Sequence, residues 1–309
     1  MFKKGARHLR SSPEYLRNVQ RIWGGRRLFV EQGTKDVGEK EEASGCKMKQ
    51  WIETLPESDF NSINQVIAVM SGKGGVGKSS VAALIGVKLA REGYRVGLLD
   101  ADITGPSIPK MFGIKSSAEA MEFGILPVKS DLGIEVMSLN LLLKNEDDPV
   151  IWRGPLIAGA VKQFWTDVIW GKLDYLIVDL PPGTGDVPIT VMQSLPLNGV
   201  VIVSSPQDVA AMIVKKAMRM ASMMDVKILG LIENMSYAVC PQCGETLYLF
   251  GPSRGEELAE SSGIPYLGAL PLDPELARFC DLGRVEEYYS EAMRSGIRWT
   301  EIVNKEVPE

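Results

Sequence analysis

The stretch that decides the fold of this chain reads Gly72-Lys73-Gly74-Gly75-Val76-Gly77-Lys78-Ser79. It satisfies the pattern G-x-x-x-x-G-K-S/T, in which glycines let backbone N–H groups approach and surround phosphate groups. In this interpretation Lys78 binds the β- and γ-phosphates, Ser79 binds Mg²⁺, and the start of the following helix adds the positive end of its dipole. An apolar run precedes the loop and a helical pattern follows it, as such a loop requires. We therefore predict that a nucleotide is bound by Gly72, Lys73, Gly74, Gly75, Val76, Gly77, Lys78, Ser79 and Ser80.

A second lysine, Lys73, directly follows the first glycine. A solvent-facing loop lysine is the simpler interpretation, but the stretch resembles the deviant Walker A form K-G-G-x-G-K-S/T. In P-loop ATPases of that form this lysine reaches the nucleotide of a facing subunit. A cation from the partner would neutralise charge that develops on the transferring phosphoryl group. The resemblance implies a homodimer, with Lys73 and Lys78 as catalytic residues.

Outward from the loop, short apolar runs alternate with longer segments of helical period. The expected strands are residues 66–70, 96–99, 175–178, 200–203, 228–232 and 266–270. The expected helices include residues 79–92, 155–168, 209–224 and 253–262. Because the apolar runs lack polar alternation, both faces of the strands should be covered, as in a parallel sheet. The order predicts an α/β fold with a doubly wound, mostly parallel sheet.

The ends of the chain differ from this regular middle. Residues 1–27 hold eight Lys/Arg and one Glu, a net +7, which leaves −12 for the remainder of a chain of net charge −5. We predict an N-terminal arm and linker over 1–60, an ATPase domain over 61–285 and a C-terminal helix or tail over 286–309. The arm is interpreted as a disordered solvated tail, with a mitochondrial transit peptide within residues 1–30 as the alternative. The expected compartment is the cytoplasm, or the mitochondrial matrix under that alternative.

Composition excludes several classes of protein. The chain has 309 residues, 45% of them hydrophobic, with only four cysteines. Such a chain can bury a sizeable core without disulfides. No apolar run approaches the roughly 18 residues that span a bilayer. The net negative charge argues against general nucleic-acid binding, and we expect no nucleic-acid partner and no stable membrane association.

Three aspartates follow predicted strands: Asp100, Asp102 and Asp179. In isolation such an aspartate is often only a turn or helix cap. Ligands of open α/β sheets bind at the carboxyl ends of the strands, so three carboxylates there fit one site beside the phosphate loop. Asp179 ends four apolar residues, which is the Walker B form. Phosphoryl transfer needs such groups to hold Mg²⁺ and to orient water.

Several motifs together resemble the Mrp/ApbC family of iron–sulfur carrier ATPases, over about residues 64–285. The motifs are Ser71–Ser79, Asp100-Ala101-Asp102-Ile103-Thr104-Gly105-Pro106-Ser107, Trp152-Arg153-Gly154-Pro155, Asp179-Leu180-Pro181-Pro182-Gly183-Thr184-Gly185-Asp186, Ser205-Pro206-Gln207-Asp208, Glu233-Asn234-Met235-Ser236 and Cys240-Pro241-Gln242-Cys243. The resemblance implies that Asp102 orients the attacking water and that Asp100 and Asp179 act around Mg²⁺. It also implies adenine contacts from Asn234 and from the backbone near Pro271.

The pair Cys240 and Cys243 forms C-x-x-C in a predicted hairpin insertion near residues 235–250. This spacing lets two thiolates bind one metal, but it does not choose between zinc and iron–sulfur, and a redox dithiol is a third interpretation. One pair supplies half of a four-coordinate site, so a symmetric dimer would complete it. The resemblance implies one [4Fe–4S] cluster bridging the dimer. Cys280 is expected to be a packed thiol late in a helix, whereas Cys46 lies alone in the linker.

The sequence thus predicts a homodimeric ATP hydrolase that requires Mg²⁺, carries a [4Fe–4S] cluster and transfers it to apo iron–sulfur proteins. One alternative is a positioning or partitioning ATPase that switches between a surface and the cytosol. Such proteins usually have a basic amphipathic C-terminal helix or a basic DNA-facing patch, whereas this chain ends in an acidic segment. The other alternative is a zinc-bridged regulatory ATPase.

Overall fold

The computed structural model describes residues 60–102, 105–121, 124–142, 154–207 and 210–303. The expectations for the N-terminal arm, Cys46, Arg153 and the last six residues lie outside the described residues. Among the described helices, none is long and apolar enough to cross a membrane.

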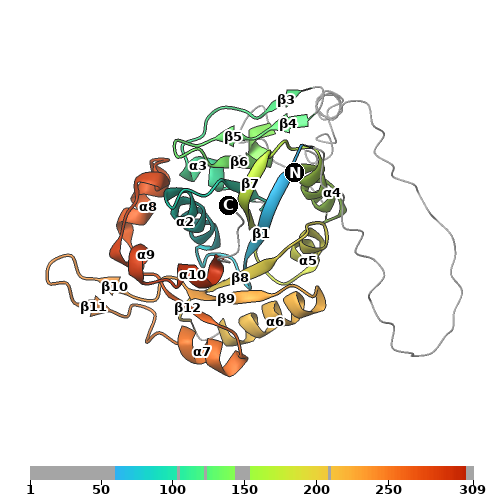
Figure 1. The fold of residues 1–309 in the computed structure, drawn as a ribbon. Coiled ribbons are helices and arrows are strands. Elements are labelled where there is room, and N and C mark those ends of the chain that lie inside the picture. Colours follow the sequence, from blue (N-terminus) through green and yellow to red (C-terminus); the bar gives the residue numbers. More distant parts are fainter. Residues whose placement is uncertain (1–59, 103–104, 122–123, 143–153, 208–209, 304–309) are drawn as a thin grey trace, which may run out of the picture. The chain divides into compact units, whose positions relative to one another are not determined.

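An eight-stranded sheet forms the centre of the fold (Figure 1). Its spatial order is β12 (Tyr266–Ala269), β9 (Ile228–Glu233), β8 (Gly199–Ser204), β1 (Ser62–Ser71), β7 (Lys172–Asp179), β2 (Val96–Asp100), β6 (Glu135–Ser138) and β5 (Val128–Lys129). Every neighbouring pair is parallel except β5 with β6. The predicted mostly parallel sheet is confirmed.

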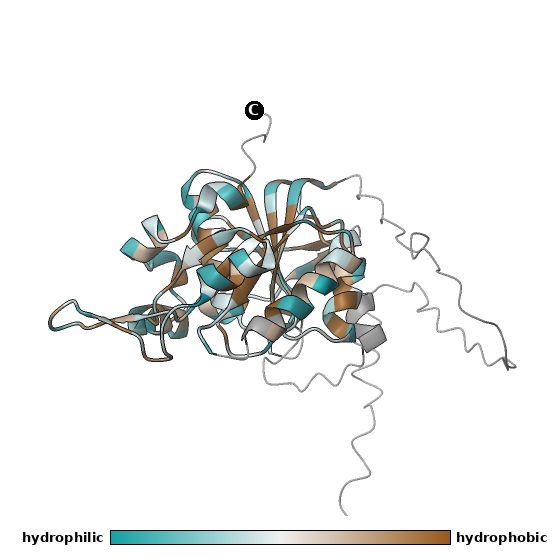
Figure 2. Ribbon diagram, turned by 90° about the horizontal axis from the view of Figure 1, so that it is seen from below, coloured by the Kyte–Doolittle hydropathy of each residue, from teal (hydrophilic) through white to brown (hydrophobic). Residues whose placement is uncertain are grey.

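Helices cover both faces of the sheet (Figure 1). One face carries α2 (Lys78–Arg91), α8 (Pro274–Asp281), α9 (Glu291–Ser295) and α10 (Trp299–Ile302). The other face carries α4 (Gly154–Thr166), α5 (Asp186–Gln193) and α6 (Ala210–Met223), and α7 (Gly255–Ser262) packs near the β12 edge. Buried strands such as β8, which has no exposed residue, explain why the apolar runs showed no alternation (Figure 2).

The structure adds elements that the apolar pattern did not predict. Strand β6 is only four residues long and includes Glu135 and Ser138, yet it pairs in parallel with β2. Further short elements are α3 (Ile108–Met111), β3 (Glu119–Met121), β4 (Gly124–Leu126), η1 (Leu139–Leu142) and η2 (Val285–Glu287). The described residues beyond Val285 pack on the domain, since Tyr288, Met293 and Trp299 are buried in the core that α2 also joins.

The predicted hairpin insertion is present as β10 (Ala238–Val239) paired antiparallel with β11 (Thr246–Leu247). It projects from the body of the domain in both views (Figures 1 and 2). Residues 241–250 are all exposed. The hairpin lies between β9 and α7 along the chain, so it rises from the carboxyl edge of the sheet, where the phosphate loop also begins.

Candidate functional site

The phosphate loop joins the end of β1 to the start of α2, as its sequence predicted. Gly75 and Gly77 have φ of +81° and +77°, the left-handed conformation that glycine adopts without steric cost. Gly77 is also the N-cap of α2, and a Cβ there would lie 2.2 Å from Asn234 Nδ2. The loop therefore requires glycine at 77 both for its backbone angle and for the close packing of Asn234.

Lys78 and Ser79 meet Asp179 at the carboxyl end of β7. Lys78 Nζ donates to Asp179 Oδ1, and Ser79 Oγ donates to Asp179 Oδ2. Asp179 is completely buried, and this burial raises the pKa of its carboxyl group, while the Lys78 charge acts in the opposite direction. Hydroxyl and carboxylate oxygens side by side are ligands that Mg²⁺ prefers, so this pair fits the predicted metal position.

Asp100 lies opposite Asp179 in the β2–β7 register. Its carboxylate accepts three backbone N–H groups: Asp102 at 3.1 Å, Ser107 at 3.0 Å and Ile108 at 3.2 Å. Burial and then the charge of Asp179 raise the pKa of Asp100 to about 8. The oxygens of Asp100 therefore hold the loop that follows β2.

That loop positions Asp102 over the phosphate site. Asp102 is 8% exposed, and its Oδ2 lies 4.0 Å from Lys78 Nζ. The structure thus brings together Lys78, Ser79, Asp100, Asp102 and Asp179, which lie as far as 101 residues apart in the chain. This is the group that the sequence placed at one edge of the sheet.

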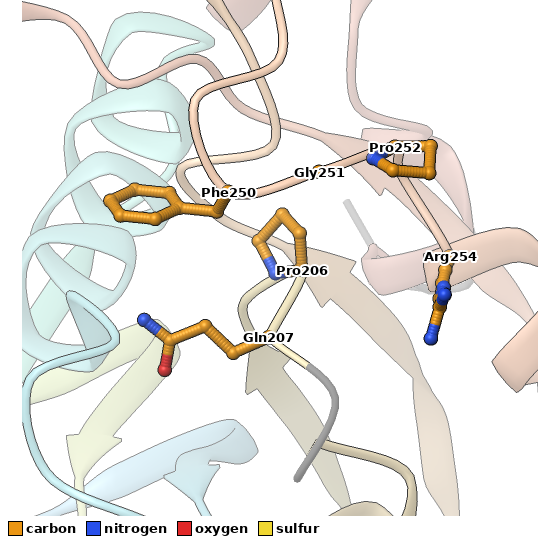
Figure 3. Close-up of a pocket in the computed structure, with 6 residues that line it drawn as sticks. All are labelled: Pro206, Gln207, Phe250, Gly251, Pro252 and Arg254. Carbon is orange, nitrogen blue, oxygen red and sulfur yellow. The ribbon is translucent and has the colours of Figure 1, made fainter.

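Lys73 points to a neighbouring loop of the same chain. Its Nζ donates to Gln207 Oε1, in the segment that follows β8. Gln207 also lines a hollow of about 290 Å³ together with Pro206, Phe250, Gly251, Pro252 and Arg254 (Figure 3). This hollow separates the loop after β8 from the segment that returns from the cysteine hairpin.

Asn234 follows β9 and is 4% exposed. Its Nδ2 donates to the carbonyl of Val76 at 2.9 Å. Pro271 lies nearby along the β12 side, because the Ser236 N–H donates to the Leu270 carbonyl at 2.9 Å. The two residues predicted to contact adenine are therefore both at the edge that carries the phosphate loop.

Cys240 and Cys243 occupy the turn of the projecting hairpin. The N–H of Cys240 donates to the Glu245 carbonyl and the N–H of Gly244 donates to the Cys240 carbonyl, each at 2.9 Å. Hydrogen bonds from the backbone of Cys243 and Gln242, and from the Cys243 thiol, lower the pKa of Cys240. Among the described residues, no group of three or more His, Cys, Asp or Glu side chains is placed to hold a metal ion. The pair provides two ligands and no more within the described part of one chain.

Cys280 lies late in α8, as predicted, and packs partly buried against the core. Burial, followed by the charge of Asp281, raises the pKa of its thiol to about 11. It is a structural thiol, far less acidic than Cys240.

The family model described as ParA: NUBPL iron-transfer P-loop NTPase matches residues 62–305 of this sequence. The chain belongs to this family. The match covers all but the first residue of the predicted ATPase domain and extends through the C-terminal helices, in agreement with their packing in the core.

Relatives of known name agree with this assignment. An iron-sulfur cluster carrier protein of Clostridium perfringens is 47% identical over 242 residues, which is 76% of this chain and 85% of the relative. One from Methanocaldococcus jannaschii is 46% identical and covers 73% of this chain and 78% of the relative. A nucleotide-binding protein of Archaeoglobus fulgidus, solved in complex with ADP, has a TM-score of 0.68 at 50% identity, covering 74% of this chain and 90% of that one. The septum site-determining protein MinD of Pyrococcus horikoshii shares the fold, with a TM-score of 0.55 at 20% identity over 79% of this chain and 97% of its own.

Two residues of this family member have contacts in the site that the sequence did not reveal. Gln207 was quoted within a motif, and only the structure shows its contact with Lys73. Glu233, which precedes Asn234, is 2% exposed and bonded at the base of the hairpin. The sequence did contain a signal for Glu233, because it is a glutamate at the end of an apolar strand. A carboxylate buried at such a position needs hydrogen-bond donors around it.

Proposed function

We propose that two copies of this chain bind one [4Fe–4S] cluster through Cys240 and Cys243 of each copy and transfer it to apo iron–sulfur proteins, with ATP hydrolysis at the phosphate loops. The observation that carries this proposal is the exposed C-x-x-C turn on a member of the iron-transfer NTPase family. Two thiolates leave half of a tetrahedral set unfilled, and a two-fold symmetric partner supplies the same two ligands again. The cluster is cargo, so a solvent-exposed position suits its delivery.

The nucleotide chemistry follows from the groups around Asp179. In the proposal, the backbone N–H groups of residues 72–80 surround the phosphates, and Lys78 exchanges its contact with Asp179 for phosphate oxygens. Ser79 and Asp179 would hold Mg²⁺, which would neutralise negative charge on the phosphates. Asp100, whose oxygens accept three backbone N–H groups, acts around the metal by holding the loop after β2.

Hydrolysis also needs an oriented water and a stabilised leaving charge. We assign to Asp102 the role of orienting this water, because Asp102 lies beside Lys78 of the phosphate loop. Lys73, half-buried in this single chain and bonded to Gln207, is assigned to the nucleotide of the partner subunit. Asn234 and the backbone near Pro271 are assigned to adenine. The A. fulgidus protein, which was solved in complex with ADP, supports nucleotide binding by this chain.

The deciding experiment is anaerobic iron–sulfur reconstitution of the full chain, followed by absorption spectra and iron and sulfide analysis. We expect about four irons and four sulfides per dimer, as a [4Fe–4S] cluster requires. The Cys240→Ala/Cys243→Ala variant should lose them and keep ATP turnover, while the matched Cys280→Ala variant should keep both. Zinc in place of iron, or iron binding that does not depend on Cys240 and Cys243, would contradict the proposal.

The expected compartment is part of the proposal and has its own test. We expect the full chain in the cytoplasm. A reporter fused after residue 30 should then stay in the cytosol, and import of the reporter into mitochondria would place the carrier in the matrix instead.

A further inference from the structure

One buried carboxylate anchors both ends of the cysteine hairpin. Glu233 is the last residue of β9 and is 2% exposed. The hydroxyl of Ser236, before the hairpin, and the hydroxyl of Ser253, after it, both donate to Glu233 Oε2. The backbone N–H of Arg254 donates to Glu233 Oε1 at 3.0 Å. The outgoing and returning arms of the hairpin therefore meet at a single group.

The next residue, Asn234, contacts the phosphate loop. Its Nδ2 donates to the Val76 carbonyl, and it packs so closely on Gly77 that a Cβ there would clash with it. Its own backbone N–H donates to the Ser204 carbonyl at 2.8 Å, at the end of β8. Asn234 therefore links the loop at Val76 and Gly77 to the backbone at residues 233–234.

The rest of the hairpin has few constraints of its own. Residues 241–250 are exposed, and the hollow of about 290 Å³ separates the returning segment at Phe250 from the loop that carries Gln207 (Figure 3). Hydrogen bonds to a buried carboxylate are stronger than neutral ones, and breaking them leaves an uncompensated buried charge. The arms of the hairpin should thus follow Glu233 when it moves.

We infer that the Glu233–Asn234 pair is the mechanical junction between the phosphate loop and the cysteine hairpin. Asn234 follows the phosphate loop through its contacts with Val76 and Gly77. Glu233 is a positioning residue that sets the exposure of Cys240 and Cys243 according to the bound nucleotide. The inference deepens the proposed function and rests on it for its biological meaning. The coupling itself involves only the phosphate loop and the cysteine hairpin, so it can be tested in the chain without a bound iron–sulfur cluster.

The experiment measures the alkylation rates of Cys240 and Cys243 by iodoacetamide in the metal-free full chain, with and without Mg·ADP. We expect Mg·ADP to change these rates at least threefold in the wild-type protein. In the Ser236→Ala/Ser253→Ala variant the ratio should fall to about one, while the Kd for ADP stays within twofold. Ser261→Ala is the matched control, because its hydroxyl bonds only the Leu258 carbonyl within α7 and is exposed. It should retain the wild-type ratio.

A second pair of variants tests Glu233 itself. Glu233→Gln keeps the shape and one acceptor oxygen, so it should restore most of the nucleotide effect that Glu233→Ala loses. A wild-type protein whose thiols ignore Mg·ADP, or a serine double variant with the full wild-type ratio, would overturn the inference. Iron–sulfur reconstitution is measured separately, so the loss of cluster binding and the loss of coupling are distinguishable outcomes.

Discussion

The nucleotide edge of the sheet and the cysteine hairpin differ in how much of each site one chain completes. At the nucleotide edge Lys78, Asp100, Asp102, Asp179 and Asn234 are each 8% exposed or less. In the hairpin the ten residues 241–250 are all exposed. The first site is assembled by strands and helices that the core holds in place, whereas the second is a turn between two strands of two residues each.

The difference has a physical reason. Buried charges need partners: Lys78 pairs with Asp179 at the end of β7 and lies 4.0 Å from Asp102, while the Asp100 carboxyl group accepts backbone N–H groups. A two-stranded hairpin has only marginal stability of its own. Cys243 is exposed and Cys240 is half-buried, so the pair can present metal ligands to another molecule. We therefore expect mutations to affect folding at the first site and cargo binding at the second.

The largest effect should come from Lys78→Ala. Turnover of ATP should fall at least about a hundredfold, because a cation on the transferring phosphoryl group is lost. Stability should also fall by about 3 kcal/mol, since Asp179 is left buried without its partner. Steady-state hydrolysis and thermal unfolding measure the two effects.

The matched control for this change is Lys88→Ala on the same helix. Lys88 pairs with Glu92 at the surface, with side chains 24% and 40% exposed. Exposed pairs contribute about 0–1 kcal/mol, so both turnover and stability should stay close to wild type. Equal losses in the two variants would show that helix α2, and not the buried pair, sets the effect.

The thiol of Cys240 in the hairpin and that of Cys280 in helix α8 should react at different rates. The pKa of Cys240 is lowered by hydrogen bonds, whereas that of Cys280 is raised to about 11 by burial. Only the thiolate reacts, so at pH 7 iodoacetamide should modify Cys240 at least about tenfold faster in the metal-free chain. Raising the pH to 9 increases the thiolate fraction of Cys280 about a hundredfold and should narrow the ratio. Peptide mass spectrometry measures both sites, and equal rates at pH 7 would contradict the assignment.

Two glycines with the same backbone angle allow a direct comparison. Gly77 has φ +77° and Gly244 has φ +76°, but only at Gly77 would a Cβ meet another atom. Gly244→Ala should cost about 1–2 kcal/mol for the left-handed angle alone. Gly77→Ala should cost about 1 kcal/mol more, because it displaces Asn234 from the Val76 carbonyl.

The same pair separates the two functions. Gly77→Ala should weaken ADP binding, as measured by calorimetry, whereas Gly244→Ala should lower cluster content after reconstitution and leave ADP binding unchanged. If Gly244→Ala weakens ADP binding as much as Gly77→Ala does, the difference in burial between the nucleotide edge and the hairpin does not separate their functions.

The smallest effect should come from the opposite end of β7. Asp174 accepts bonds from Arg95, which lower the pKa of its carboxyl group. A lowered folded pKa means that this stabilisation is present above the unfolded pKa of roughly 3.9 and is lost as the pH falls through the folded value. Because Arg95 is 56% exposed, Asp174→Asn should cost only about 0.5–1 kcal/mol at pH 7 and less than that at pH 2. Urea unfolding at both pH values tests this, and neither ATP turnover nor cluster content should change.

Much of the fold was predictable from local patterns. The six apolar runs became β1, β2, β7, β8, β9 and β12, because strands buried on both faces need continuous apolar residues. Strand β6 was missed, since four residues that include a glutamate and a serine carry too weak a signal. Its place is set by pairing with β2, which is a tertiary interaction.

The sequence by itself determined the phosphate loop, the aspartates at the strand ends and the C-x-x-C turn, because glycine positions, strand endings and ligand spacing are local properties. Only the tertiary structure decided that Lys73 meets Gln207, 134 residues away, and that Asp100 holds a backbone loop. It alone joined Ser236, Ser253 and Arg254 to Glu233. The physical reason is that a polar side chain takes the donors or acceptors that packing brings within about 3 Å, and spacing along the chain does not specify which groups those are.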